Sequence, residues 1–198
     1  MCGRYFLPLE EDDGELAEVI RAVSEKYGGE APLAAHGEIF PGQTVPTLAN
    51  SRKGEPGAYA MRWGMSRPSG GAGLVINARS ETAGDKGMFR SSWMDRRCLI
   101  PAWRYFEWER RDREKVKYAI GPAGQSGFYL AGLYRYEPDE RYPRFVILTR
   151  AASEPVAFIH PRMPVIFDLK SARAWLNPQT PPRQMLEAAL EDMAFEAV

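Results

Sequence analysis

The sequence has few of the residues that cross-link a chain, bind a metal or anchor it in a membrane. Its 198 residues include only 2 Cys and 2 His, too few for a disulfide framework and little for a zinc site. No apolar run is long enough to span a bilayer, and no cationic start leads into an apolar stretch. We therefore expect no membrane span, no signal peptide, no metal or cofactor, and a cytoplasmic location.

An excess of charge of one sign is also absent, because 26 Lys and Arg residues balance 26 Asp and Glu residues. This balance argues against indiscriminate coating of nucleic acid, but it is compatible with a local basic patch. The 44% apolar and 26% charged fractions are those of an ordinary globular chain. The length fits one domain with a sizeable core, and we expect that domain to cover residues 1–198.

Short apolar segments separated by turn residues fill most of the chain. They predict strands at 3–7, 45–49, 58–63, 74–76, 98–101, 105–108, 116–120, 128–136, 145–149 and 165–167. Helices are expected from Asp12 or Asp13 to Gly28 and at 88–93, 154–159, 171–176 and 182–190, with a loop over 28–44. This pattern predicts an α+β fold, a compact domain built on a curved, barrel-like mixed β-sheet with peripheral helices.

Cys2 stands directly behind the initiator Met1. Because the Cys side chain is small, a methionine aminopeptidase should be able to remove Met1 and leave Cys2 with a free α-amine beside its thiol. The amine titrates near pH ~7.7–8.0 and the thiol near ~8.5, so both have a reactive fraction at neutral pH. An aldehyde can take the amine as a Schiff base, and the thiol can then close a thiazolidine ring. The alternative is an accidental, buried Cys.

Three further polar residues, Asn77, Glu107 and His160, border or interrupt apolar segments. Each has an ordinary structural explanation: Asn77 can cap a helix, Glu107 can be a paired core carboxylate, and His160 can be a buried, hydrogen-bonded ring. Together with Cys2 they supply a nucleophile, an orienting amide and two acid–base groups, which is the set that covalent chemistry needs.

Five sequence blocks occur in order along the chain. They are M-C-G-R-Y at 1–5, N-A-R-S-E-T at 77–82, R-R-C-L-I-P-A at 96–102, F-E-W at 106–108 and I-H-P-R-M-P-V at 159–165. In these blocks the chain resembles the SRAP family, the SOS response-associated peptidases. The resemblance implies a protein that traps abasic sites in single-stranded DNA by forming a thiazolidine crosslink at its N-terminal Cys.

Carried onto this chain, the resemblance implies that Cys2 forms the crosslink and that Asn77 holds the amine or the sugar. Glu107 would move protons during Schiff-base formation and ring closure, and His160 would protonate the sugar oxygen. The implied DNA contacts are Arg4, Arg79, Arg162, Pro41 and Trp63. We expect a monomer whose partner is single-stranded DNA containing abasic sites, and which associates with the nucleoid when bound.

The chain departs from the family pattern at two places that bear on DNA. A Trp usually follows the W-G block shortly after it, but none follows Trp63-Gly64 in residues 66–70, so a different base-stacking surface is expected. The family's G-F-Y-E-W block begins here with Arg104 in place of Gly, while its carboxylate is kept as Glu107.

Two other functions remain open from the sequence. Cys2 can be the N-terminal nucleophile of an amidohydrolase or of a peptidase that removes its own Met1, which would require an oxyanion hole. The protein can also be a non-covalent binder of single-stranded DNA that uses aromatic residues and arginines. A stable protein–DNA adduct argues against both, whereas a released acid product favours the hydrolase.

Overall fold

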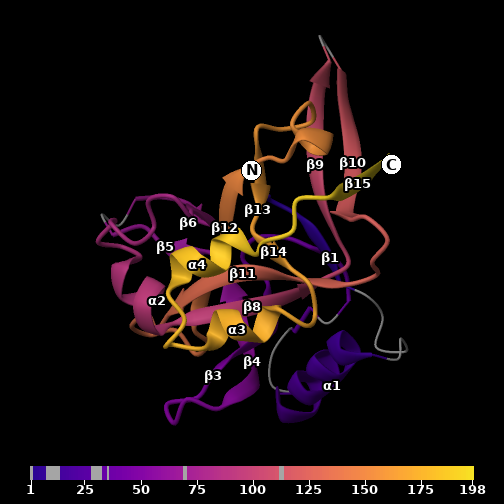
Figure 1. Ribbon diagram of the computed structural model, residues 1–198. Coiled ribbons are helices and arrows are strands. Elements are labelled where there is room, and N and C mark those ends of the chain that lie inside the picture. Colours follow the sequence, from indigo (N-terminus) through magenta and orange to yellow (C-terminus); the bar gives the residue numbers. More distant parts are fainter. Residues whose placement is uncertain (1, 8–13, 28–32, 35, 69–70, 112–113) are drawn as a thin grey trace.

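A computed structural model of the chain shows two curved β-sheets with short helices at their periphery (Figure 1). The structure describes residues 2–7, 14–27, 33–34, 36–68, 71–111 and 114–198. Its α+β class, with mostly strands and few helices, confirms the predicted fold class.

The larger sheet has eight strands. They are β3 (Thr44–Asn50), β4 (Pro56–Trp63), β7 (Asn77–Arg79), β8 (Arg97–Ala102), β11 (Phe128–Arg135), β12 (Arg144–Ala151), β13 (Arg162–Pro164) and β14 (Ile166–Phe167). The ladder runs β12–β4–β3–β8–β11, and β11 pairs again with β12, so this sheet curls into a ring. β12 pairs in parallel with β4 and β7, which makes the sheet mixed, as predicted.

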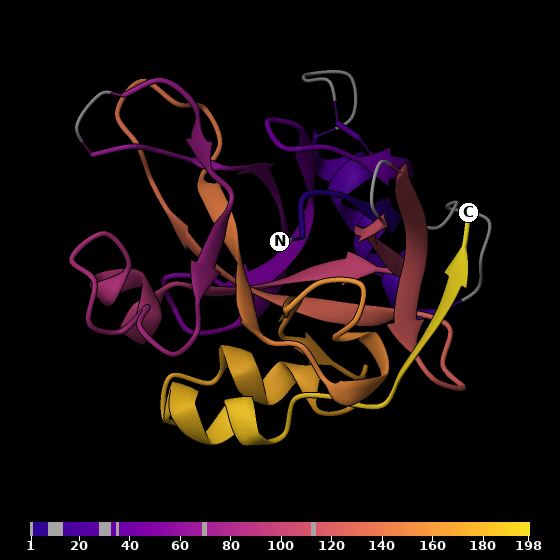
Figure 2. The same cartoon turned by 90° about the horizontal axis from the view of Figure 1, so that it is seen from above.

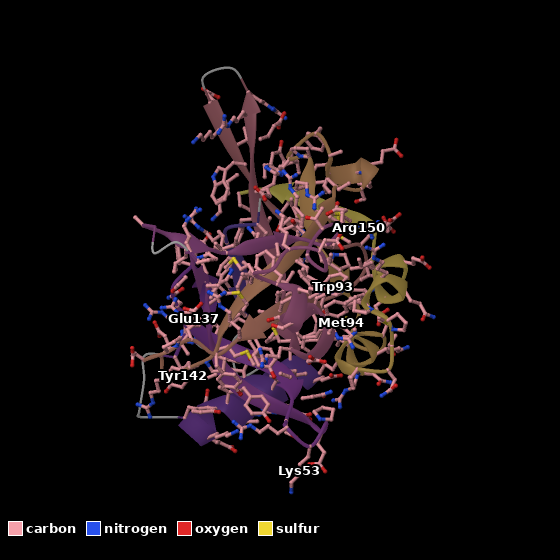
Figure 3. All side chains as sticks on the ribbon, turned by 90° about the vertical axis from the view of Figure 1, so that its left-hand side faces the viewer. Lys53, Trp93, Met94, Glu137, Tyr142 and Arg150 are labelled. Atoms are coloured by element: carbon pink, nitrogen blue, oxygen red, sulfur yellow. The ribbon has the colours of Figure 1, made fainter. Side chains whose placement is uncertain are left out.

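The second sheet is antiparallel, with the strand order β15-β10-β9-β1-β2. Its strands are β1 (Tyr5–Leu7), β2 (Gly37–Ile39), β9 (Arg104–Arg111), β10 (Glu114–Pro122) and β15 (Met193–Ala197). β9 and β10 form a long hairpin that rises above the rest of the molecule (Figures 1 and 3). The hairpin predicted around residues 109–115 is thereby confirmed. β2 lies in the segment predicted as a loop, and β15 follows the segment predicted to end the chain as a helix.

The remaining elements are short. They are β5 (Met65–Ser66), β6 (Leu74–Val75), α1 (Glu15–Tyr27), α2 (Arg90–Asp95), the 3-10 turn η1 (Glu154–Val156), α3 (Ala172–Leu176) and α4 (Pro182–Glu187). α1 buries the apolar face predicted from its spacing, including Leu16, Ile20 and Val23. Its predicted cap residues, Asp12 or Asp13 and Gly28, lie outside the described residues.

The N-terminal segment lies in the interior rather than along an edge. Figure 2, seen from above, shows this indigo segment running between strands of the two sheets. Cys2 and Tyr5 are 0% exposed and belong to a buried cluster with Trp63 and Phe145. Side chains fill the space between the strands (Figure 3). In the described ranges, no helix is both long and apolar enough to cross a membrane.

Candidate active site

Cys2 lies in the core, with its Sγ 3.9 Å from the carbonyl oxygen of Arg4. Burial, and after it the negative charge of Glu107, raises the pKa of the Cys2 thiol from 9.0 to about 12. The thiol is therefore protonated at neutral pH. Because the thiolate is the nucleophilic form, a nearby group must take the proton if the sulfur is to attack.

Asn77 holds the backbone of Cys2 from the neighbouring sheet. Its Nδ2 donates a hydrogen bond to the Cys2 carbonyl oxygen at 2.9 Å, although 75 residues separate the two in sequence. Asn77 begins strand β7 and pairs with Ile147 of β12, so the alternative that it caps a helix is excluded. Its Oδ1 is buried and accepts no hydrogen bond from any residue that the structure describes. Asn77 thus fixes Cys2 and retains an acceptor for a further donor.

Glu107 reaches the Cys2 environment from strand β9. Tyr5 pairs with Tyr105, and the Phe106 amide donates to the Arg4 carbonyl oxygen at 2.9 Å, so β9 runs beside the residues that follow Cys2. Glu107 is only 5% exposed. Its charge contributes to the raised pKa of the Cys2 thiol, which places the carboxylate within electrostatic reach of the sulfur.

His160 lies on the segment between η1 and β13. Its neighbours Ile159 and Met163 belong to the same buried cluster as Cys2. The ring Nδ1 is 3.0 Å from both the backbone nitrogen and the carbonyl oxygen of Arg162. A neutral Nδ1 can accept from that N–H, and a protonated Nδ1 can donate to that carbonyl. The backbone of Arg162 therefore offers His160 a partner in either protonation state, which suits a group that transfers protons.

Strand β12 brings the two predicted phosphate-binding arginines together. Thr149 pairs with Arg79 on one side and with Pro164 of β13 on the other. Arg162 Nη2 donates to the Thr149 carbonyl oxygen at 2.7 Å and to Glu81 Oε2 at 2.8 Å. The Arg162 hydrogen bond is the main reason why the pKa of Glu81 is lowered. Arg79 is exposed, and no described carboxylate forms an ion pair with it. The sequence analysis did not assign a role to Glu81, although it lies two residues after Arg79.

Arg4 stands among aromatic residues. Its guanidinium lies 4.4 Å from the ring centroid of Phe40 and 5.0 Å from that of Trp108, and it forms a 3.6 Å ion pair with Glu38. Phe40 is 40% exposed and precedes the predicted DNA contact Pro41. The sequence analysis did not single out Phe40 or Trp108 as binding residues. The F-E-W block alone was the available signal for Trp108.

The prediction that Trp63 contacts DNA is wrong for this conformation, because its side chain is 0% exposed. The indole stacks near Phe145 at 6.3 Å and lies 5.3 Å from the Tyr5 ring. Its Nε1 donates to the Ile76 carbonyl oxygen at 3.0 Å. Trp63 therefore packs the core and fixes the residue immediately before Asn77.

Comparison with known proteins identifies the family. The sequence model described as SOS response associated peptidase (SRAP) matches residues 1–198. The chain belongs to the SRAP family. The structure accordingly joins Cys2 to Asn77 by contact and to Glu107 by charge, and it places His160 beside their cluster. In the described part of the chain, no group of three or more His, Cys, Asp or Glu residues could hold a metal ion.

Several relatives carry names that describe a DNA lesion. Abasic site processing protein YoqW of Bacillus subtilis is 31% identical over 204 residues, covering 96% of this chain and 87% of that protein. YedK of Escherichia coli is 26% identical and covers 96% of this chain and 85% of the relative. HMCES of Xenopus tropicalis is 31% identical over 224 residues, covering 89% of this chain and 66% of that protein. Both of these share the name abasic site processing protein.

Solved structures share the fold over the whole chain. A protein from Bacteroides thetaiotaomicron superposes with a TM-score of 0.79 at 21% identity, covering 100% of this chain and 92% of the other. A phage-related protein from Bordetella bronchiseptica superposes with a TM-score of 0.75 at 25% identity, covering 100% of this chain and 94% of the other.

Proposed function

We propose that this protein processes abasic sites in single-stranded DNA by forming a thiazolidine crosslink through Cys2 after Met1 is removed. The observation that carries the proposal is the setting of Cys2, a buried thiol near the start of the chain, held by Asn77 and close to the charge of Glu107. The family and the relatives' names support abasic DNA as the substrate class.

The chemistry balances with the loss of one water. The Cys2 amine attacks the aldehyde carbon of the ring-opened deoxyribose, and the resulting carbinolamine loses water to give an imine. The thiol sulfur then bonds to the same carbon, the C=N π electrons move to nitrogen, and the thiol proton ends on that nitrogen. No oxidant, reductant or metal takes part.

Glu107 is the group that moves this proton. Since the pKa of the Cys2 thiol is about 12, few molecules carry a thiolate at neutral pH. A carboxylate beside the sulfur accepts the thiol proton as the S–C bond forms and returns it to the nitrogen. His160 acts on the other side of the reaction, where protonation of the ring oxygen favours opening of the sugar to the aldehyde.

Removing the amide of Asn77 is expected to slow crosslinking. Asn77→Ala leaves the Cys2 carbonyl without its donor, and a lost hydrogen bond of this kind costs ~1–3 kcal/mol, or about 5- to 150-fold in rate if it acts in the transition state. Asn77→Asp keeps the shape but turns an acceptor toward the carbonyl, so it should be at least as slow. Single-turnover crosslinking rates measure both variants. Rates equal to wild type would assign Asn77 to the fold alone.

Arg79 is expected to contribute more to DNA affinity than Arg162. Arg79 is exposed without a described ionic partner, whereas Glu81 already offsets the charge of Arg162. Arg79→Ala should therefore lower the salt slope of single-strand binding by about 0.7 for one lost phosphate contact. Glu81→Gln should strengthen binding, because it releases Arg162. Titrations across a salt series measure these slopes, and a salt-independent affinity would contradict the DNA interface.

Intact-mass measurement tests the proposed function directly. The active protein should lack Met1 and should gain the mass of an abasic single-stranded oligonucleotide minus one water. Release of an acid product without a stable adduct would instead support the hydrolase alternative. Binding of the oligonucleotide with no gain in mass would support a non-covalent binder.

A further inference from the structure

One face of the β15-β10-β9-β1-β2 sheet carries a row of aromatic and cationic side chains. Side chains that pair across neighbouring strands lie on the same face of a sheet. Phe6 pairs with Arg104, and Lys117 pairs with Trp108. Because Arg104, Phe106 and Trp108 alternate along β9, these residues share the face that is opposite to Tyr105 and Glu107.

The contacts along this face are those of a cation–aromatic surface. Lys117 Nζ lies 4.1 Å from the Phe106 ring centroid, and Arg4 lies over Trp108 at 5.0 Å. Phe6 remains 36% exposed between them and Arg104. Aromatic faces interleaved with cations are the surfaces on which successive bases of a single strand stack while its phosphates are neutralised. Glu38 pairs with both Arg4 and Lys117 and offsets part of this positive charge.

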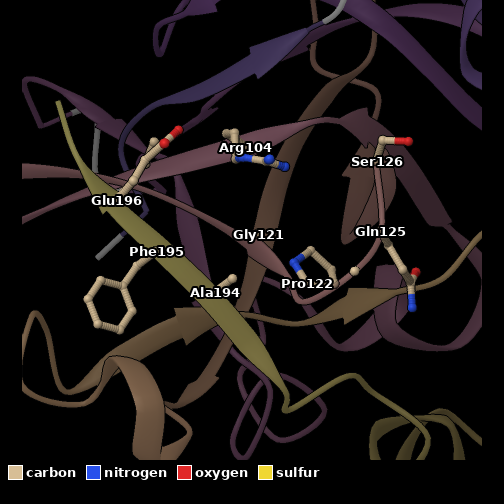
Figure 4. Close-up of a pocket in the computed structure, with 10 residues that line it drawn as sticks. Arg104, Gly121, Pro122, Gln125, Ser126, Ala194, Phe195 and Glu196 are labelled. Atoms are coloured by element: carbon tan, nitrogen blue, oxygen red, sulfur yellow. The ribbon is translucent and has the colours of Figure 1, made fainter.

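A pocket of about 410 Å³ lies at the end of this face, between β15 and the loop after β10. Figure 4 shows the Arg104 side chain extended near Gly121, with Gln125 and Ser126 on the loop and Glu196 on β15. Arg104 Nη1 donates to the Trp103 carbonyl oxygen at 2.8 Å, and no described carboxylate forms an ion pair with this arginine. A Cβ at Gly121 would lie 3.1 Å from Arg104 Nη1, so the glycine keeps room for the guanidinium.

We infer that the Arg104 pocket is a phosphate subsite that extends the single-stranded DNA track away from Cys2 along this face. The inference rests on the proposed function for its ligand, a phosphodiester of the bound strand. The remaining Arg104 donors can take a phosphate oxygen, and the side chains of Gln125 and Ser126 add neutral donors at the same pocket. A strand rise of ~3.3 Å per residue separates Arg104 from Trp108 by about 13 Å. Only an oligonucleotide that continues past Trp108 therefore reaches Arg104.

The position is also where the chain differs from the family pattern, since Arg104 replaces the Gly of G-F-Y-E-W. A glycine would supply no donor to the pocket. The added side chain thus provides a contact that depends on this chain's own sequence and not on the crosslinking chemistry. Glu196, on the opposite wall, opposes an anion and should limit its affinity.

The test is a length series of single-stranded oligonucleotides carrying a tetrahydrofuran abasic analogue, which has no aldehyde and gives equilibrium binding. For the oligonucleotide extended toward Arg104, Arg104→Ala should weaken binding about tenfold and lower the salt slope by about 0.7. A short oligonucleotide limited to the crosslinking site should bind wild type and variant equally. Arg104→Lys should restore the slope, and Glu196→Gln should strengthen binding of the extended oligonucleotide only.

Arg183→Ala is the matched control, because Arg183 is an exposed arginine on α4 whose side chain is 77% accessible. It should leave every affinity unchanged. If Arg104→Ala matches Arg183→Ala on the extended oligonucleotide, the subsite is refuted. In that event, a normal yield of adduct with authentic abasic DNA would leave the proposed function standing. Failure of wild type to form any adduct would refute the proposed function independently of Arg104.

Discussion

Cys2→Ala is expected to abolish the adduct that survives denaturation without a reductant. The variant keeps its α-amine and can still form an imine with the abasic aldehyde, but it has no sulfur to close the ring. Denaturing electrophoresis after incubation with abasic single-stranded DNA should show the crosslink for wild type alone. With borohydride present, both proteins should show an adduct, because reduction traps the imine.

Retention of Met1 is expected to have an even larger effect, since it removes the free amine and the thiol's ring-closing partner together. A non-cleavable N-terminal extension should therefore give no adduct, with or without borohydride. Cys2→Ser falls between these cases: it can close an oxazolidine, which opens more readily than a thiazolidine, so most of the unaided stability should be lost.

Cys98→Ala is the control for the thiol. Cys98 is 0% exposed on β8, burial raises its pKa, and its nitrogen is in a peptide bond. The variant should crosslink at the wild-type rate if it remains folded, which circular dichroism checks. A stable, reductant-independent adduct from Cys2→Ala or from the extended protein would contradict the N-terminal thiazolidine and direct the search to a side-chain nucleophile.

The sequence was sufficient to predict most strands and the residues of the site, because both leave local signals. Apolar runs between turns marked β3, β4, β8, β11 and β12. Asn77 and Glu107 stood out because each is a polar residue within an apolar context. The structure adds how they meet: the hydrogen bond from Asn77 to Cys2 spans 75 residues, and no local pattern encodes that distance.

Elements whose formation depends on distant partners were missed. β2 is three residues long, contains Gly37 and Glu38, and exists because Tyr5 pairs with Ile39. β15 forms on β10, where Phe195 pairs with Ile120. Tertiary pairing decides both of these short strands, since their own strand propensity is weak. The same limit applies to Trp63, whose burial depends on Tyr5 and Phe145 and could not be read from the W-G block.

Glu107→Gln is expected to slow crosslinking by ~10²-fold or more while making the Cys2 thiol easier to ionise. The two effects oppose each other. Loss of the carboxylate removes one of the causes that raise the thiol pKa, so that pKa should fall from about 12. It should stay above 9.0, because burial is the larger cause and is unchanged. At a given pH the variant therefore carries more thiolate and yet reacts more slowly.

Two measurements separate these effects. The rate of Cys2 alkylation as a function of pH reports the thiol pKa, and single-turnover crosslinking reports the chemistry. Alkylation of the variant should reach its plateau at lower pH than that of wild type. Its crosslinking rate should rise steeply with pH, because the sulfur must lose its proton to solvent. Wild type should depend less on pH, since its carboxylate accepts that proton.

Glu109→Gln provides the matched control two residues along β9. Glu109 hydrogen-bonds Arg111 and Tyr118 at the hairpin and is not among the causes that raise the pKa of Cys2. It should leave both pH profiles unchanged. If Glu107→Gln accelerates crosslinking in proportion to its thiolate fraction, the carboxylate acts only through its charge on the sulfur. The proton transfer must then be assigned to another group, and the retained rate would exclude Glu107 as the acid–base residue.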